Sequence, residues 1–75
     1  INDKWIIDNI NFFPESIVEV YNRWGEMLFR SNPGYTNPWD GTFNGSELPV
    51  GTYYYVINLH DERFEPLTGP ITIMR

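Results

Sequence analysis

Short stretches in which apolar and polar residues alternate predict β-strands along this chain. In "SIVEVYN", Val18 and Val20 fall on one face and the intervening residues on the other, which is typical of a half-exposed antiparallel strand. The stretch "EMLFRS" follows soon after Gly25, which can adopt a positive φ, so the two stretches predict a tight hairpin. No long window keeps apolar residues at the 3.6-residue spacing of a helix, because Gly and Pro recur too often.

Further stretches complete the set of predicted strands. "KWIID" predicts a short first strand over residues 4–8, and "TYYYVINLH" predicts a long strand over residues 52–60, whose bulk on both faces indicates a central position. "GPITIMR" predicts a last strand in which Ile71 and Ile73 share a face. Residues 32–51, between "EMLFRS" and "TYYYVINLH", carry the turn signals "NPG", "NPWDG", "NG" and "LPVG". The pattern predicts an all-β fold, namely a small Ig-like antiparallel β-sandwich of about seven strands with Greek-key-type connections.

The stretch "LPVGTYYY" carries a possible tyrosine corner. In Greek-key sandwiches, the hydroxyl of such a tyrosine bonds back to an upstream backbone group. Tyr53 is the candidate, since Gly51 lies two residues before it. The alternative is an ordinary cross-strand aromatic residue, and both interpretations favour the same fold.

Composition indicates one small domain over residues 1–75 that is stabilised by aromatic side chains. The chain has no cysteine, but it has three Trp, five Tyr and five Phe, and each aromatic can bury about 150–250 Å². Five basic against ten acidic residues, a net charge of −5, argue against binding of nucleic acid. The longest apolar run, "YYYVI", is too short to insert into a membrane. We expect a monomeric domain that was excised from a longer protein.

Few residues offer catalytic or metal-binding chemistry. His60 is the only imidazole and lies at the end of a predicted strand, so an enzyme is not expected. Asp3, Asp8 and Asp40 could supply the oxygen ligands that calcium prefers, but no complete loop of alternating acids is present. Capping of turns is therefore the favoured role of these aspartates, and no cofactor is expected.

Trp24 and Trp39 both lie near glycines and allow two interpretations. Their rings could form a stacking platform for sugars, which would make the domain a carbohydrate-binding or adhesive surface module. Alternatively, both rings cap the ends of the sandwich. The composition does not separate these alternatives.

Several motifs together resemble a known family. The segments "INDKW", "VYNRWGEMLF", "NPWDGTFNG", "LPVGTYYYVI" and "LTGPITIMR" are similar, in order and spacing, to the gliding motility-associated C-terminal domain. This family is also called the type B sorting domain of the Bacteroidota type IX secretion system. Its members usually carry an Asn-Gly-Asp-Gly-rich lead, of which this chain retains Ile1, Asn2 and Asp3.

The resemblance implies a sorting signal at the C-terminus of a large secreted or surface protein, such as an adhesin. It implies passage through the periplasm to the cell surface or medium, and recognition by outer-membrane machinery that includes a PorP/SprF-like protein. Rigid turns with adjacent Trp and Arg suit recognition by a receptor, and the last strand could pair with one. The candidate partner-binding residues are Arg23, Trp24, Gly25, Trp39, Asp40, Gly41, Ile73 and Arg75.

Overall fold

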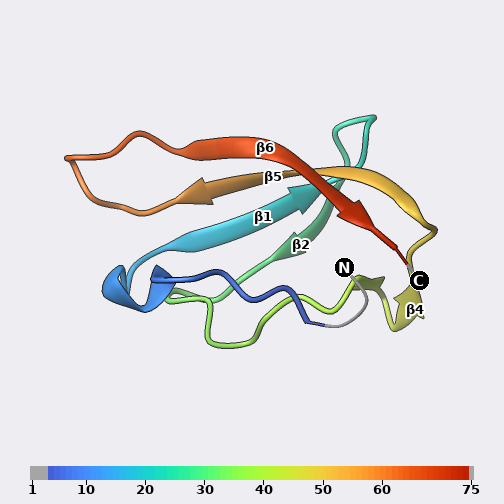
Figure 1. Ribbon diagram of the computed structural model, residues 1–75, viewed down its shortest axis with the longest axis horizontal. Coiled ribbons are helices and arrows are strands. Elements are labelled where there is room, and N and C mark those ends of the chain that lie inside the picture. The colour runs from blue at the N-terminus through green and yellow to red at the C-terminus, as the bar shows by residue number, and fades with distance from the viewer. Residues whose placement is uncertain (1–3, 75) are drawn as a thin grey trace.

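The computed structural model describes residues 4–74 and shows an all-β fold (Figure 1). Asp3 and Arg75, two of the candidates above, lie outside the described residues. A single 3-10 turn precedes six strands within residues 4–74. The elements are η1 (Ile10–Phe12), β1 (Ile17–Tyr21), β2 (Met27–Arg30), β3 (Thr42–Phe43), β4 (Ser46–Glu47), β5 (Gly51–Asn58) and β6 (Leu67–Ile73).

Four of the strands form one antiparallel sheet in the order β2-β1-β5-β6, and β3 and β4 form a separate hairpin. The predicted hairpin around Gly25 is confirmed, because β1 pairs with β2. The predicted central position of the longest strand is also confirmed, because β5 pairs with β1 on one side and β6 on the other. Asn44 and Gly45 make the tight reversal between β3 and β4, both at positive φ.

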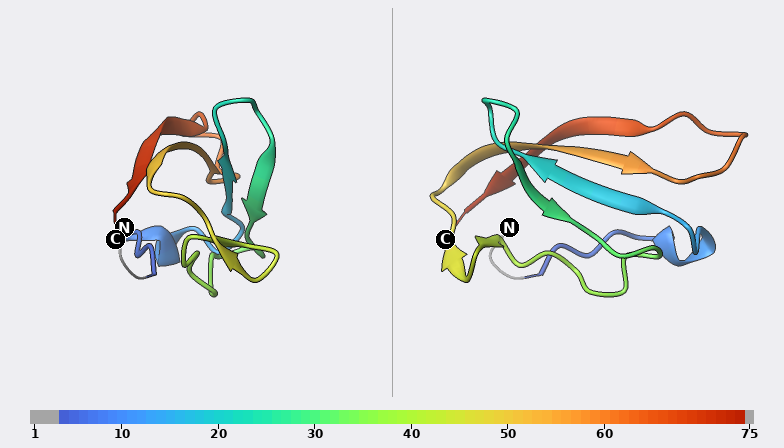
Figure 2. Two further views of the ribbon diagram at one scale, coloured as in Figure 1. Left: turned by 90° about the vertical axis from the view of Figure 1, so that its right-hand side faces the viewer. Right: turned by 180° about the vertical axis from the view of Figure 1, so that it is seen from behind.

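The sheet forms one layer, and irregular chain forms the other (Figure 1, Figure 2). Residues 4–16 and the stretch that follows β2 run across one face of the sheet. Val18 and Val20 of β1 are completely buried while the residues between and beside them are partly exposed, which confirms the predicted alternation. The buried apolar core consists of Val18, Val20, Leu28, Tyr35, Trp39, Tyr53, Ile57, Ile71 and Ile73.

Three details of the predicted fold differ from the structure. Residues 4–74 contain six strands where about seven were expected, and Greek-key-type connections are not confirmed, since the larger sheet consists of two hairpins joined through β1 and β5. The predicted strand at residues 4–8 is wrong. Trp5 donates a backbone hydrogen bond to the carbonyl oxygen of Trp39, at 2.7 Å, but the facing chain is itself irregular. A ladder needs two regular partners, so the apolar side chains of "KWIID" pack on the core without forming a strand.

Gly69 in β6 provides space for an aromatic ring on the neighbouring strand. It pairs with Tyr55 of β5, and a Cβ atom at Gly69 would lie 2.7 Å from the Tyr55 hydroxyl oxygen. The Tyr55 ring also packs against Trp5, at 5.4 Å between ring centroids, so moving it disturbs a second contact. The ring thus covers the glycine, as aromatic residues do in other sheets.

Gly69→Ala is therefore expected to lower the free energy of unfolding by about 1–3 kcal/mol, through the overpacking of Tyr55. Urea denaturation measures the change. Thr68→Ala, at an exposed neighbouring position of β6, serves as the control and should stay within about 0.5 kcal/mol of the wild type. A strand glycine normally gains stability on replacement by alanine, so an increase would show that Tyr55 moves away at no cost.

Candidate functional site

The turn between β1 and β2 is held by the side chain of Asn22. Its Oδ1 accepts hydrogen bonds from the backbone N–H groups of Trp24, at 3.0 Å, and Glu26, at 2.9 Å. Its Nδ2 donates to the Glu26 carboxylate at 3.0 Å. Gly25 adopts a φ of 83°, a conformation that glycine accepts without strain, and donates to the Asn22 carbonyl oxygen. These bonds fix the turn before any partner arrives.

Trp24 projects from this turn into solvent. Its exposed fraction is 76%, whereas the core Trp39 retains 2%. The Arg23 guanidinium lies over the indole, with Cζ at 4.3 Å from the ring centroid. The stacked pair combines a large apolar surface with a positive charge on a rigid support.

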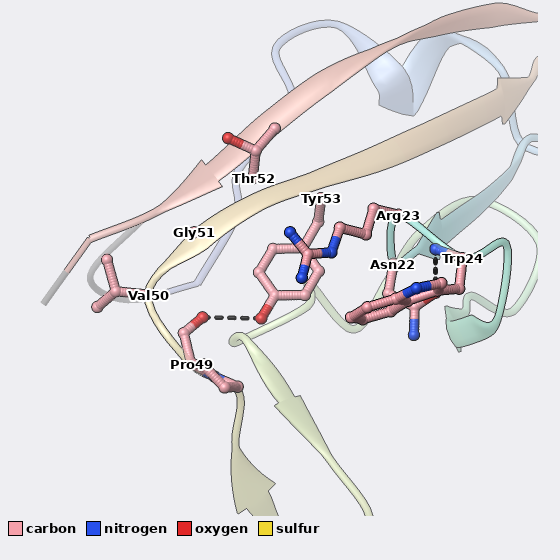
Figure 3. A pocket seen from close by; sticks show the side chains of 8 residues that line it. All are labelled: Asn22, Arg23, Trp24, Pro49, Val50, Gly51, Thr52 and Tyr53. Carbon is pink, nitrogen blue, oxygen red and sulfur yellow. Dashed lines mark hydrogen bonds between the residues drawn. The ribbon is translucent and has the colours of Figure 1, made fainter.

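Beside the stacked pair is an open pocket of about 290 Å³ between the turn and the beginning of β5 (Figure 3). Pro49 and Val50, whose exposed fraction is 63%, line the side of the pocket opposite the turn, and the Val50 side chain points away from Trp24 in the view of Figure 3. Its lining residues are Asn22, Arg23, Trp24, Pro49, Val50, Gly51, Thr52 and Tyr53. We call four exposed residues of this lining, Arg23, Trp24, Pro49 and Val50, the Trp24 surface.

The second wall of the pocket is anchored by Tyr53. Its hydroxyl donates a hydrogen bond to the carbonyl oxygen of Pro49 at 2.7 Å, and its ring is buried (Figure 3). This bond to an upstream backbone group confirms the predicted tyrosine corner. The corner fixes the loop that carries Pro49 and Val50, so both walls of the pocket are held by internal hydrogen bonds.

Trp39 lies in the core. Its ring packs against Phe29 and Tyr53, with centroids 6.2 Å and 6.4 Å away. Its indole N–H donates to the carbonyl oxygen of Thr42 at 3.1 Å, and its backbone N–H donates to the Tyr35 hydroxyl at 3.1 Å. Because its ring is buried, Trp39 cannot share a sugar-stacking platform with Trp24. The structure therefore separates the two tryptophans into a core residue and a surface residue.

Asp40 caps a turn, the role favoured for it. Its Oδ1 accepts hydrogen bonds from the Thr42 hydroxyl, at 2.6 Å, and from the Thr42 backbone N–H, at 3.2 Å. The bond from the Thr42 hydroxyl lowers the pKa of the Asp40 carboxyl below its usual range. Within residues 4–74, no three His, Cys, Asp or Glu side chains converge as ligands of a metal ion would. Gly41, next in the chain, is buried and adopts a φ of 82°.

The last strand offers few groups to a partner. Ile73 is completely buried, in contrast to the exposed position that a contact residue needs. β6 is an edge strand of the sheet, and Pro70 within it has no backbone N–H to donate. Proline in an edge strand opposes the addition of another strand. Pairing of a further strand with β6 is therefore disfavoured.

The structure brings together only some of the predicted partner-binding residues. Arg23 and Trp24 line the same pocket, with Gly25 next to them in the turn, whereas Trp39, Asp40, Gly41 and Ile73 do not line it. Pro49 and Val50 were missed by the sequence analysis. The only sequence feature that points to Pro49 and Val50 is the predicted tyrosine corner. It indicates that the loop before Tyr53 is fixed, but it does not indicate that this loop faces the turn with Arg23.

Comparison with known proteins identifies the family. The CHU_C type IX secretion signal domain matches residues 1–73. No curated protein and no solved structure matched the chain. In the part of the chain that the structure describes, no helix has the length and apolar character needed to cross a membrane. Since the match spans nearly the whole chain and agrees with the resemblance carried by its motifs, the chain belongs to the CHU_C type IX secretion signal domain family.

Proposed function

We propose that a PorP/SprF-like outer-membrane protein reads this domain as a folded sorting signal, and that it does so at the Trp24 surface. The family match supports a C-terminal sorting signal, an exported protein and an interaction with secretion machinery in general terms. The receptor class, the surface and the passage through the periplasm to the cell surface are parts of this proposal. The domain needs no catalytic activity for this role.

The observation that carries the proposal is the exposure of Trp24 on a turn fixed by the Asn22 side chain. Trp and Arg are enriched among the residues that dominate binding energy at interfaces. A partner that binds a prefixed turn loses less conformational entropy than one that must order it. Trp39 is buried and Trp5 packs against the core, so the exposed indole of Trp24 is the natural anchor for a receptor.

A carbohydrate-binding module is the second candidate, and the exposed indole of Trp24 is the observation that favours it. Stacking on a sugar uses the face of an aromatic ring. The Arg23 guanidinium covers one face of Trp24, which leaves a single face for a sugar. Binding to a glycan array that is lost in Trp24→Ala would favour this candidate.

The proposal predicts that Trp24→Ala lowers export without lowering stability. A fluorescent cargo carrying this chain at its C-terminus, behind a signal peptide, is expressed in hosts with and without the secretion system. Loss of an anchor residue costs about 2 kcal/mol of binding, so secreted fluorescence is expected to fall roughly tenfold or more. Phe12→Ala is the matched control, because Phe12 is 71% exposed and belongs to η1, outside the pocket.

Circular dichroism should show melting temperatures within a few degrees for both variants, because both side chains are exposed. Normal export of Trp24→Ala would contradict the Trp24 surface as the recognition site. Retention of the wild-type fusion in the periplasm of the competent host would contradict the sorting function itself.

A further inference from the structure

We propose that the Trp24 surface binds a peptide segment in which a single carboxylate adjoins a non-polar side chain. The carboxylate binds the Arg23 guanidinium, and the non-polar side chain occupies the pocket between Trp24 and Pro49. This inference rests on the proposed function, because the segment is taken to belong to the receptor.

Arg23 has no acidic partner among the residues that the structure describes. Arg30 pairs with Glu19 at 3.1 Å, and Arg63 pairs with Asp61 at 2.6 Å. Glu26 lies on the same turn as Arg23, but its carboxylate accepts a hydrogen bond from the Asn22 side chain. Arg23 thus carries a positive charge on the wall of a pocket, without a carboxylate of the described chain to neutralise it.

The stacking of Arg23 on Trp24 prepares the guanidinium for a carboxylate. The guanidinium lies over the indole, with Cζ at 4.3 Å from the ring centroid, and its N–H groups that do not face the ring stay available for hydrogen bonds. Two parallel N–H groups match the two oxygens of a carboxylate, and such paired hydrogen bonds are both strong and directional. Arg23, Trp24 and Tyr53 all line the pocket, and in the view of Figure 3 the guanidinium overlaps the edge of the Tyr53 ring.

The rest of the pocket suits a non-polar side chain. Pro49 and the Trp24 indole offer carbon atoms, and the hydroxyl of Tyr53 is already engaged with the Pro49 carbonyl oxygen. A pocket of about 290 Å³ lies at the lower end of the range of sites that enclose a whole small molecule. The pocket is partly open to solvent and can admit one side chain of a longer peptide.

The charge of the domain limits the partner to one carboxylate at this position. The chain carries a net charge of −5, so a run of acids or a polyphosphate is repelled by the rest of the surface. A single carboxylate placed directly on Arg23 gains a short-range contact that outweighs this diffuse repulsion. A segment with one acid and adjacent apolar residues fits both conditions.

Selection from a displayed library of random heptapeptides tests this inference on the 75-residue chain. The immobilised proteins are the wild type, Arg23→Gln, Arg23→Lys and Arg63→Gln. On the wild type, peptides with one Asp or Glu beside Leu, Ile, Val, Met or Phe should be enriched about tenfold over their frequency in the library, because charge-assisted hydrogen bonds are the strong ones. Arg63→Gln removes another exposed arginine, away from the pocket, and should select the same peptides.

Arg23→Gln should abolish the enrichment, and Arg23→Lys should retain only part of it, because lysine keeps the charge but not the paired N–H groups. Absence of acidic peptides from the wild-type selection, an empty selection included, overturns the inference. An unchanged selection by Arg23→Gln overturns it equally. In either case the proposed function stands if Trp24→Ala still lowers export, and it fails if Trp24→Ala exports normally.

Discussion

Replacement of Trp39 by alanine is expected to lower the free energy of unfolding by about 3–5 kcal/mol, the cost of removing a large buried aromatic side chain. The Trp39 ring packs against Phe29 and Tyr53, and its indole N–H is bonded to the carbonyl oxygen of Thr42. A domain of 75 residues is stable by only about 4–11 kcal/mol. The substitution therefore removes a large part of the total stability.

Urea denaturation followed by fluorescence measures this loss, with Trp24→Ala as the matched control. Because the Trp24 ring is exposed, its removal should change the free energy of unfolding by no more than about 0.5 kcal/mol. The cargo fusion with Trp39→Ala should also export poorly, through unfolding of the signal. Equal unfolding midpoints for Trp39→Ala and the wild type would be incompatible with a structural role of Trp39.

Removal of the Tyr35 hydroxyl, in Tyr35→Phe, is expected to cost about 2–4 kcal/mol, because it leaves two backbone groups without their partner. The hydroxyl donates to the carbonyl oxygen of Trp5 at 2.6 Å and accepts from the backbone N–H of Trp39 at 3.1 Å. It thus ties the N-terminal segment to the segment that carries the core tryptophan. Tyr54→Phe is the control, since Tyr54 is 46% exposed and should change little.

The same hydroxyl makes the contribution of Tyr35 to the free energy of unfolding depend on pH. Burial raises the pKa of Tyr35 above its usual value of 10.0, although the hydrogen bond from the Trp39 backbone lowers it in part. The neutral form is therefore favoured in the folded state. This contribution is present below pH 10 and is lost as the pH rises from 10.0 through the higher pKa of the folded state.

Denaturation of Tyr35→Phe and the wild type between pH 7 and about pH 11 tests both effects, because this range spans the ordinary titration of tyrosine. The variant should be less stable at pH 7, and the difference should shrink above pH 10.0, where the wild type loses its Tyr35 contribution. Hydrogen exchange at the Trp39 amide should also be faster in the variant. Equal stabilities at pH 7 would show that water replaces the hydroxyl at no cost.

Much of the fold could be predicted because it depends on neighbours along the chain. The alternation around Val18 and Val20 predicts a face, and the sheet buries that face. The tyrosine corner joins Tyr53 to Pro49, four residues away, so a short motif contains all of its parts. The segment "KWIID" misled the prediction of a first strand, because its apolar pattern is satisfied by packing while its backbone faces irregular chain.

Only half of the candidate site could be predicted. The turn with Arg23 and Trp24 has a local signature in "NRWGE", since Asn and Gly are the residues that such a turn requires. The opposite wall of the pocket comes from Pro49 and Val50, more than twenty residues further along the chain. No local pattern links these two walls.

The sequence by itself determined the all-β class, the hairpin between β1 and β2, the tyrosine corner and the family, because short-range periodicity, turn chemistry and motif order carry them. The tertiary structure alone decided which tryptophan is displayed. Trp24 and Trp39 have similar neighbours in the sequence. The Tyr35 hydroxyl, however, bonds to the backbone of both Trp5 and Trp39, and the irregular layer that these bonds hold together buries Trp39. Burial depends on contacts between residues thirty or more positions apart, such as Trp5 with Tyr35 and with Tyr55, and such contacts form only when the whole chain is folded.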